Sequence, residues 1–182
     1  ALIDTSDRPA PFLLPTDLPL SHGIGAVSLS GITALIGVRD IGLVKATDRI
    51  LVSGAAGGVG SHVAELAKAL GAQSVVGIAG GPEKCGRLTT EMGYDRVIDY
   101  KNDNVDSALD DAFPEGIDLY FDNVGGSLLD NVLGRLRRRA RVAICGSISE
   151  YLIDSKDKHR FVNLQSLGRQ DAKIEGFFVF DY

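Results

Sequence analysis

The chain has 182 residues, of which 45% are hydrophobic, and this is enough for one domain with a sizeable core. Its formal net charge of −5 supplies no field that would attract nucleic acid or an anionic membrane surface, so we expect neither as a partner. The two cysteines form no disulfide framework and no zinc ligand set, which is typical of a reduced, cytoplasmic protein.

In chain order, residues 1–20 carry four of the six prolines and predict an irregular arm or linker. Residues 23–43 predict a buried apolar helix of small residues. Its most apolar stretch, 24–38, is too short to cross a bilayer. Short apolar runs then alternate with helix-like segments. The predicted strands lie at 50–53, 74–79, 96–99, 118–122, 141–145 and 174–180. The predicted helices lie at about 58–70, 82–92, 103–112, 127–138 and 159–168.

This alternation predicts an α/β fold, a Rossmann doubly wound six-stranded parallel sheet with helices on both faces. Residues 21–182 would form this single domain. Ligands of such sheets bind beyond the carboxyl ends of the strands, near the point where the strand order reverses. The loops that follow the predicted strands are therefore where we look for a site.

Four glycines lie within residues 54–60, directly after the first predicted strand. A tight turn would use glycine, and so would a loop whose backbone closely approaches a phosphate. The spacing of Gly54, Gly57 and Gly60 between a strand and a helix favours the phosphate site. The reason is that a helix N-terminus offers free N–H groups and a positive dipole end.

The second predicted strand ends without the acidic residue that NAD enzymes usually carry there. About 20 residues after the glycines, such enzymes place an Asp or Glu that binds ribose hydroxyls. Here the strand ends in Ala79-Gly80-Gly81, and Lys84 follows at the start of a helix. Cations without a carboxylate suit a 2′-phosphate, so we predict NADP(H) as the cofactor. The alternative is that Lys84 is an ordinary solvated helix residue.

Other catalytic patterns on this fold are absent from the sequence. Tyr151 is followed by lysine at Lys156, five positions on, so the Tyr-x-x-x-Lys spacing of short-chain dehydrogenases fails. No G-x-S-x-G elbow of a serine hydrolase occurs, and no cluster of Cys and His suggests a metal. The remaining chemistry is hydride transfer by a bound cofactor without metal.

Several stretches together resemble the zinc-independent medium-chain dehydrogenase/reductases, and within them the leukotriene B4 dehydrogenase, prostaglandin reductase and alkenal or curcumin reductase group. They are "SGAAGGVG", "GIAGGPEKC", "VIDYKN", "DLYFDNVGG", "RVAICGSISEY" and "IEGFFVFDY". The resemblance implies NADPH-dependent reduction of the carbon–carbon double bond of a small enone or enal. It also implies a missing N-terminal substrate domain and a homodimer of the full-length protein.

Site residues follow from the resemblance position by position. It implies that the pyrophosphate half of the cofactor meets Gly54, Ala56, Gly57, Gly58, Val59 and Gly60. The 2′-phosphate side is implied to meet Gly80, Lys84 and Tyr100. The remaining implied cofactor contacts are Thr33, Asn123, Cys145, Gly146, Ser147, Ile148, Phe178 and Phe180. Tyr151 is the implied catalytic residue near substrate, although Leu152 replaces the usual Asn after it.

Two rivals to the reductase stay open, a non-catalytic NADPH-binding module and a quinone reductase of the same superfamily. Tyr151 has a structural alternative, because the proton can come from water. The basic run 135–141 predicts a helix C-terminus whose cations face solvent. The acidic stretch 102–111 predicts a solvated helix face. We interpret Cys85 as an inert thiol and the three histidines as structural or surface residues.

Overall fold

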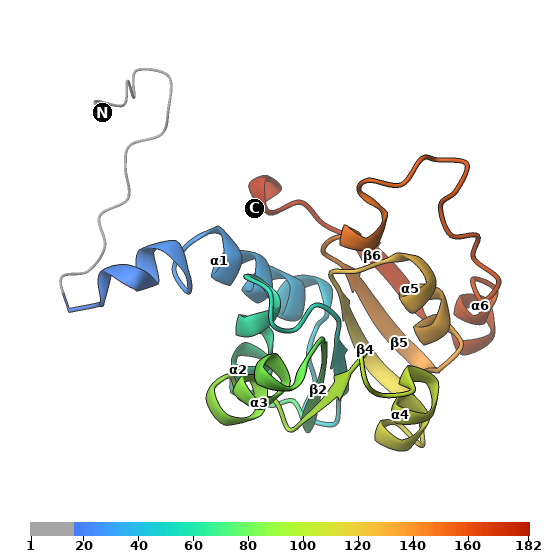
Figure 1. Ribbon diagram of the computed structural model, residues 1–182, viewed down its shortest axis with the longest axis horizontal. Helices are drawn as coiled ribbons and strands as arrows, with labels where there is room; N and C mark the ends of the chain where they lie inside the picture. Colours follow the sequence, from blue (N-terminus) through green and yellow to red (C-terminus); the bar gives the residue numbers. More distant parts are fainter. Residues whose placement is uncertain (1–16) are drawn as a thin grey trace.

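The structure is a computed structural model that describes residues 17–182 (Figure 1), so most of the predicted arm at 1–20 lies outside the described residues. Six strands alternate with helices as predicted. The strands are β1 (Arg49–Val52), β2 (Ser74–Ala79), β3 (Arg96–Asp99), β4 (Ile117–Asp122), β5 (Leu136–Ile144) and β6 (Lys173–Gly176). The α-helices are α1 (Leu29–Ile36), α2 (Gly60–Ala69), α3 (Pro82–Glu91), α4 (Val105–Ala112), α5 (Gly126–Leu133) and α6 (Ser166–Gln170).

All strand pairs are parallel, and their order is β3-β2-β1-β4-β5-β6. The chain therefore builds outward from β1 to β3, crosses back, and builds outward again from β4 to β6. The prediction of a six-stranded doubly wound sheet is confirmed. The strand order reverses between β1 and β4, which is where ligands of such sheets bind.

The sheet buries both of its faces, because successive side chains of a strand point to opposite sides. Ile50 and Val52 of β1 pack with Val63 of α2 in one core. Leu51 between them packs with Val132 of α5 in a second core on the other face. Helices α1 to α3 cover the first face and α4 to α6 the second (Figure 1).

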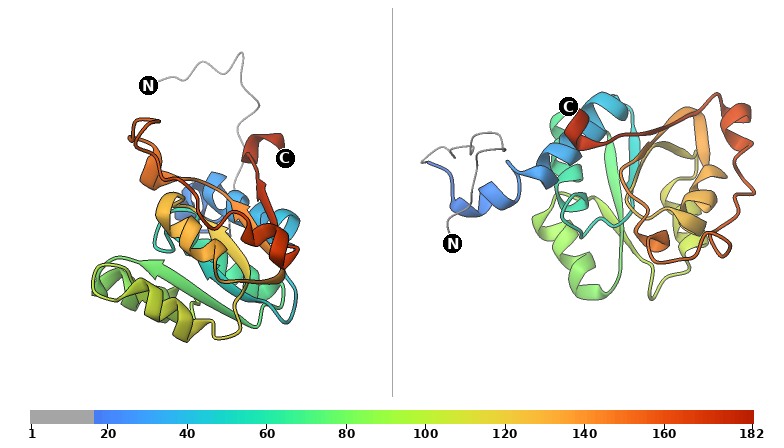
Figure 2. Two further views of the ribbon diagram at one scale, coloured as in Figure 1. Left: turned by 90° about the vertical axis from the view of Figure 1, so that its right-hand side faces the viewer. Right: turned by 90° about the horizontal axis from the view of Figure 1, so that it is seen from above.

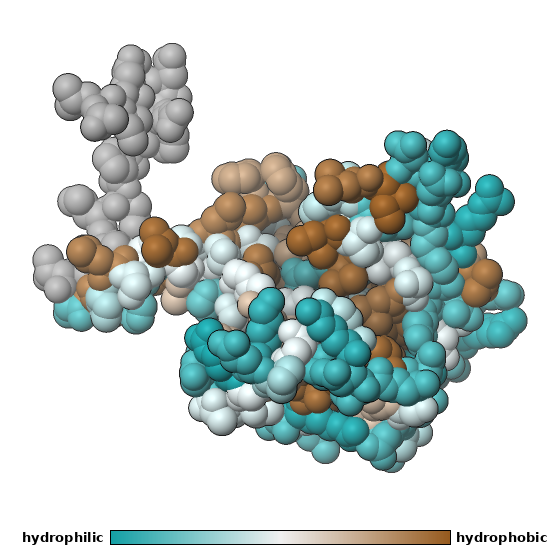
Figure 3. All heavy atoms as spheres, viewed as in Figure 1, coloured by the Kyte–Doolittle hydropathy of each residue, from teal (hydrophilic) through white to brown (hydrophobic). Residues whose placement is uncertain are grey.

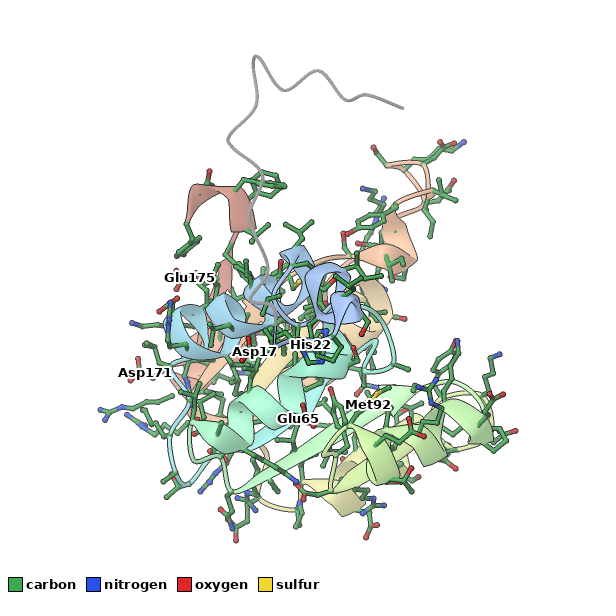
Figure 4. The ribbon with its side chains drawn as sticks, turned by 90° about the vertical axis from the view of Figure 1, so that its left-hand side faces the viewer. Asp17, His22, Glu65, Met92, Asp171 and Glu175 are labelled. Carbon is green, nitrogen blue, oxygen red and sulfur yellow. The ribbon has the colours of Figure 1, made fainter. Side chains whose placement is uncertain are left out.

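The first helical layer is closed by contacts between neighbouring elements. Glu65 of α2 and Met92 at the end of α3 lie in this layer (Figure 4). The loop after α3 packs closely on α2, since a Cβ atom placed on Gly93 would lie 3.3 Å from Cγ of Glu65. The C-terminal turn η4 (Val179–Asp181) returns to lie beside α1 (Figure 2).

The basic run 135–141 is a strand and not the predicted helix end. It forms most of β5, and four of its five arginines pair with carboxylates of neighbouring elements: Asp110, Asp118, Asp171 and Asp48. A β-bulge interrupts the pairing with β4, and Arg139 within it has φ 62°. Leu, Arg and Ala favour helix locally, but these tertiary ion pairs and the sheet decide the outcome.

Several predicted boundaries are also wrong. The helix predicted at 23–43 is three pieces: the 3-10 turn η1 (Leu20–Ile24), α1, and the π-helical turn η2 (Gly37–Ile41). It is also not buried throughout, since η1 has no buried residue and Leu29 of α1 is 51% exposed. Helix α5 ends at Leu133, and the last strand ends at Gly176. The acidic stretch is a solvated helix face as predicted, since Asp106 and Asp110 are each 65% exposed, and both also pair with Arg135. Within residues 17–182, no helix has the length and apolarity needed to cross a membrane.

Candidate functional site

A cavity of about 1010 Å³ lies at the carboxyl ends of the strands, across the point where their order reverses. Five loops build it, those that follow β1, β2, β3, β4 and β5. The predicted site residues in its lining are Gly54, Ala56, Gly57, Gly58, Val59, Gly60, Gly80, Lys84, Tyr100, Asn123, Cys145, Gly146, Ile148 and Tyr151. The sequence motifs thus converge on one site although they are up to 97 positions apart, from Gly54 to Tyr151.

The glycine loop after β1 is a bare backbone turn. Gly54 has φ 58°, and a Cβ atom on it would lie 3.2 Å from Cβ of Asn123. Gly60 opens α2 so close to the loop that a Cβ atom there would lie 2.8 Å from Cα of Ala55. Glycine suits the left-handed conformation of Gly54, which other residues rarely adopt.

This loop leaves backbone donors free at the start of α2. The Gly57 N–H donates to the Gly54 carbonyl at 2.9 Å, which closes the turn. Among residues 17–182, the N–H groups of Gly58 and Val59 have no hydrogen-bond acceptor. Two unused donors beside the positive end of a helix dipole are suited to hold an anion such as a phosphate.

The loop after β2 carries the candidate cation. Lys84 lies in the first turn of α3, lines the cavity, and has no ion-pair partner within residues 17–182. The ring of Tyr100 lies over Gly80, where a Cβ atom would approach Cε1 of that ring to 2.7 Å. Lys84 and Tyr100 therefore flank a glycine surface that has room for a negatively charged group.

Asp99 ties the loops after β2 and β3 together. Its carboxylate accepts hydrogen bonds from the N–H of Gly81 at 2.8 Å and from Nδ2 of Asn102 at 2.7 Å. The hydrogen bond from Gly81, followed by those from Asn102 and Lys101, lowers the pKa of this carboxyl. Asp99 ends β3 and not β2, and its carboxylate already accepts three hydrogen bonds within the protein, so we assign it to holding the two loops together.

The other end of the cavity is formed by the segments after β4 and β5. Asn123 donates through Nδ2 to the Ser53 carbonyl at 2.7 Å and so bridges the loops after β1 and β4. The Tyr151 hydroxyl accepts a hydrogen bond from the N–H of Ser147 at 3.2 Å. Burial, and then the charge of Asp122, raises the pKa of the Cys145 thiol to about 11.

Four predicted residues lie outside the cavity lining, namely Thr33, Ser147, Phe178 and Phe180. Thr33 is buried in α1, and its hydroxyl donates to the Leu29 carbonyl at 2.6 Å. The role of these four as cofactor contacts stays a prediction. Eight further lining residues are not among the predicted site residues: Ile78, Ala79, Val105, Val124, Ser127, Leu128, Asn131 and Ser149. Several of them come from α4 and α5, whose approach to the cavity no local motif signals.

Residues 58–182 match a family described as zinc-binding dehydrogenase. This chain belongs to that family. A 2-alkenal reductase (NADP(+)-dependent) of Nicotiana tabacum is 40% identical over 167 residues, 91% of this chain and 48% of the relative. The (+)-pulegone reductase of Mentha piperita is also 40% identical over 167 residues, with the same coverage.

A solved structure of CurA from Vibrio vulnificus in complex with NADPH superimposes with a TM-score of 0.81. The two sequences are 36% identical over the aligned region, which covers 88% of this chain and 48% of the CurA chain. The resemblance to the alkenal and curcumin reductase group is thus confirmed. This dehydrogenase-family chain spans about half the length of the relatives it matches.

The family's descriptive name raises the question of a zinc site. Within residues 17–182, no three His, Cys, Asp or Glu side chains are grouped closely enough to hold a metal ion. The described part of the chain therefore does not fit zinc. It does fit a dinucleotide phosphate, since the glycine cradle, the free donors and Lys84 all face one cavity.

Proposed function

We propose that this chain is the cofactor-binding domain of a zinc-independent, NADP(H)-dependent oxidoreductase. Its reaction is the reduction of the carbon–carbon double bond of small α,β-unsaturated ketones or aldehydes. One observation carries the proposal: Lys84, which has no ion-pair partner within residues 17–182, shares a cavity with a glycine cradle and with the end of β2, whose own residues carry no carboxylate. The relatives named above act as further support, because their names describe enone or alkenal reductases.

Each part of the cavity has a role in this proposal. The free N–H groups of Gly58 and Val59 hold the pyrophosphate, and Lys84 with Tyr100 holds the 2′-phosphate. When bound, NADPH supplies the hydride. The Tyr151 hydroxyl accepts from the Ser147 N–H, which leaves its own proton directed elsewhere. It is therefore able to donate to a substrate carbonyl oxygen as negative charge develops there.

A binding titration tests the cofactor assignment. NADPH and NADH are titrated into the wild-type chain and into Lys84→Ala. We expect NADPH to bind about tenfold or more weakly to the variant, and NADH to bind unchanged, because one charge-assisted contact to phosphate is lost. Arg87→Ala is the matched control, since Arg87 lies one turn further along α3 and pairs with Glu91 at 3.1 Å.

The outcomes are distinct. An NADPH preference that disappears in Lys84→Ala and survives in Arg87→Ala supports the 2′-phosphate site. Equal binding of NADPH and NADH by the wild-type chain contradicts the NADP(H) proposal. Loss of the NADPH preference in both variants would indicate that the combined positive charge of α3, and not a contact with Lys84, selects NADPH.

The two rivals are separated by activity of the longer protein. A binding module would bind NADPH and reduce neither enones nor quinones, whereas a quinone reductase would prefer quinones. The position of Tyr151 in the cavity wall favours an enzyme, because phosphate binding does not need this side chain. A cytoplasmic location remains a prediction from the cysteine content.

We further propose that the longer protein is a homodimer joined through the β6 edge. Among the described strands β6 pairs only with β5, so its other edge offers free backbone groups. Phe178, Phe180 and Tyr182 follow it and are 61%, 71% and 66% exposed. Figure 3 shows apolar side chains over this C-terminal segment, over the N-terminal helical segment and at the start of the crossover after β5.

A further inference from the structure

Asp122 is a fully buried carboxylate at the end of β4, and no cation pairs with it in the described part of the chain. Its Oδ1 accepts hydrogen bonds from the Ser53 hydroxyl at 2.8 Å and the Tyr120 hydroxyl at 2.7 Å. The same oxygen accepts from the N–H groups of Val124 at 2.9 Å and Gly125 at 3.0 Å. Four donors converge on one oxygen, and an ionised carboxylate, which only accepts, fits them.

These bonds fix the loop after β4 from beneath. Gly125 has φ 71° and donates to both carboxylate oxygens, the second at 3.2 Å. Ser53 extends the network, because its hydroxyl also accepts the Asn123 N–H at 2.9 Å. Asn123 and Val124, which line the cavity, are thereby held by one buried group that does not itself reach the cavity lining.

The loop after β4 in turn holds the segment after β5. The Asn123 carbonyl accepts the Ile148 N–H at 3.2 Å, and the Val124 carbonyl accepts the Ser149 hydroxyl at 2.6 Å. The Asp122 carbonyl itself accepts the N–H groups of Cys145 at 2.8 Å and Gly146 at 3.0 Å. The walls that follow β4 and β5, including the turn that leads to Tyr151, thus depend on the conformation around Asp122.

We propose that Asp122 is a positioning residue for the half of the cofactor site opposite Lys84. Its carboxylate holds the two wall segments in place before ligand arrives, so binding does not have to order them. This inference rests on the proposed function, since it assumes that a dinucleotide phosphate spans the cavity. A group of equal size that presents an N–H donor would disturb the loop without opening a void.

Asp122→Asn makes this change, because its amide NH₂ must face either the donors at Oδ1 or the Gly125 N–H at Oδ2. Asp130→Asn is the matched control. Asp130 is 3% exposed and accepts the Asn163 N–H at 2.8 Å and His159 Nε2 at 2.9 Å. It holds the crossover after β5 onto α5, and it does not line the cavity.

The experiment compares two ligands by calorimetry, NADPH and adenosine 2′,5′-bisphosphate, which lacks the nicotinamide half and so reaches only the Lys84 end and the glycine loop. For Asp122→Asn we expect NADPH affinity to fall about tenfold and bisphosphate affinity to change less than about twofold, since only the far wall is displaced. The fluorescence of bound NADPH should shift toward that of the free cofactor. Asp130→Asn should leave the affinity ratio and the fluorescence unchanged.

Tyr120→Phe removes one donor from the network and serves if Asp122→Asn does not fold. We expect a smaller loss of NADPH affinity, about threefold, again without loss of bisphosphate affinity. Unchanged NADPH binding in either folded variant overturns the inference, as does an equal loss of both ligands. A wild-type chain that binds neither ligand overturns the proposed function instead, so the two failures are distinguishable.

Discussion

Glycines with the same appearance in the sequence have different constraints at the residue scale. Gly60 opens α2 with backbone atoms of Ala55 at 2.8 Å from where its Cβ would be. Gly86 in α3 has nothing within 4 Å of that position. The difference lies in the tertiary approach of the β1 loop to α2 and cannot be read from residue type.

Gly60→Ala is therefore expected to abolish NADPH binding and to destabilise the fold by about 1–3 kcal/mol, because the clash is with backbone. Gly86→Ala, also in a helix, is expected to be neutral or to stabilise by up to about 1 kcal/mol. Urea unfolding and an NADPH titration measure both effects. A Gly60→Ala chain that binds normally would show that the loop has more room than this geometry indicates.

Cys145 offers a test of the electrostatics of the cavity floor. With a pKa near 11, its thiolate fraction at pH 8 is about one in a thousand, against about a quarter for an ordinary thiol. We expect alkylation by iodoacetamide to be about two hundred times slower than in the unfolded chain, and to rise with pH. Peptide mass spectrometry follows the rate at this residue.

The same measurement has an internal control. Burial is the largest cause of the raised pKa of Cys145, and the charge of Asp122 is the second. Asp122→Asn removes this charge and should therefore speed the alkylation. A folded wild-type chain in which Cys145 reacts as quickly as in the unfolded chain would contradict the assigned burial and charge.

The sequence could identify residues of the site whose requirement is local. Gly57 and Lys84 were predicted because a strand, a loop and a helix start follow one another in the chain. The supporting role of Asp122 could not be predicted. Its donors are the hydroxyls of Ser53, 69 positions earlier, and Tyr120, with two N–H groups of its own loop, and they converge on it only in the folded sheet. Leu128 and Asn131 were missed for the same reason, since they face the cavity only once α5 is packed on the sheet.

At the element scale, the alternation of short apolar runs with helical segments was sufficient to predict the sheet. The prediction found the end of β5 but missed its start, because the run Arg135–Arg141 has helical residue preferences. Its arginines pair with carboxylates on α4, β4 and the loop before β1. These ion pairs form only when the chain is folded. The residue pattern within one element therefore cannot predict an ion pair with another element.

Arg141 is the most constrained of these arginines. It pairs with Asp48 at side-chain exposures of 12% and 3%, and its Nε donates to the Gly42 carbonyl at 2.8 Å. Arg141→Ala should lower the free energy of unfolding by about 3–5 kcal/mol, because Asp48 would be left buried and unpaired. Equilibrium unfolding in urea measures the change.

Arg139→Ala is the control on the same strand. Arg139 and Asp171 pair at 3.3 Å with exposures of 75% and 64%, so its loss should cost less than about 1 kcal/mol. Similar effects of the two substitutions would show that the Arg141 contacts do not hold the loop before β1 in solution.

At the scale of the whole molecule, the exposed β6 edge leads to a prediction for the longer protein. Phe178→Glu with Phe180→Glu should convert a homodimer into a monomer, since charges would replace the apolar contact. Sedimentation velocity measures the mass. Leu20→Glu, at an exposed residue of η1 distant along the chain, is the control and should remain dimeric. A wild-type monomer would contradict the proposed assembly.

The cavity straddles the two halves of the doubly wound sheet, with walls from the loops of β1 to β3 on one side and of β4 and β5 on the other. A ligand in this cavity contacts both halves and therefore stabilises the folded chain. At a free ligand concentration of one hundred times its dissociation constant, binding adds about 2.7 kcal/mol to the free energy of unfolding. The lifetime of this chain against proteolysis would then follow the supply of cofactor. A cell that runs low on the dinucleotide, reduced and oxidised together, would degrade the chain sooner.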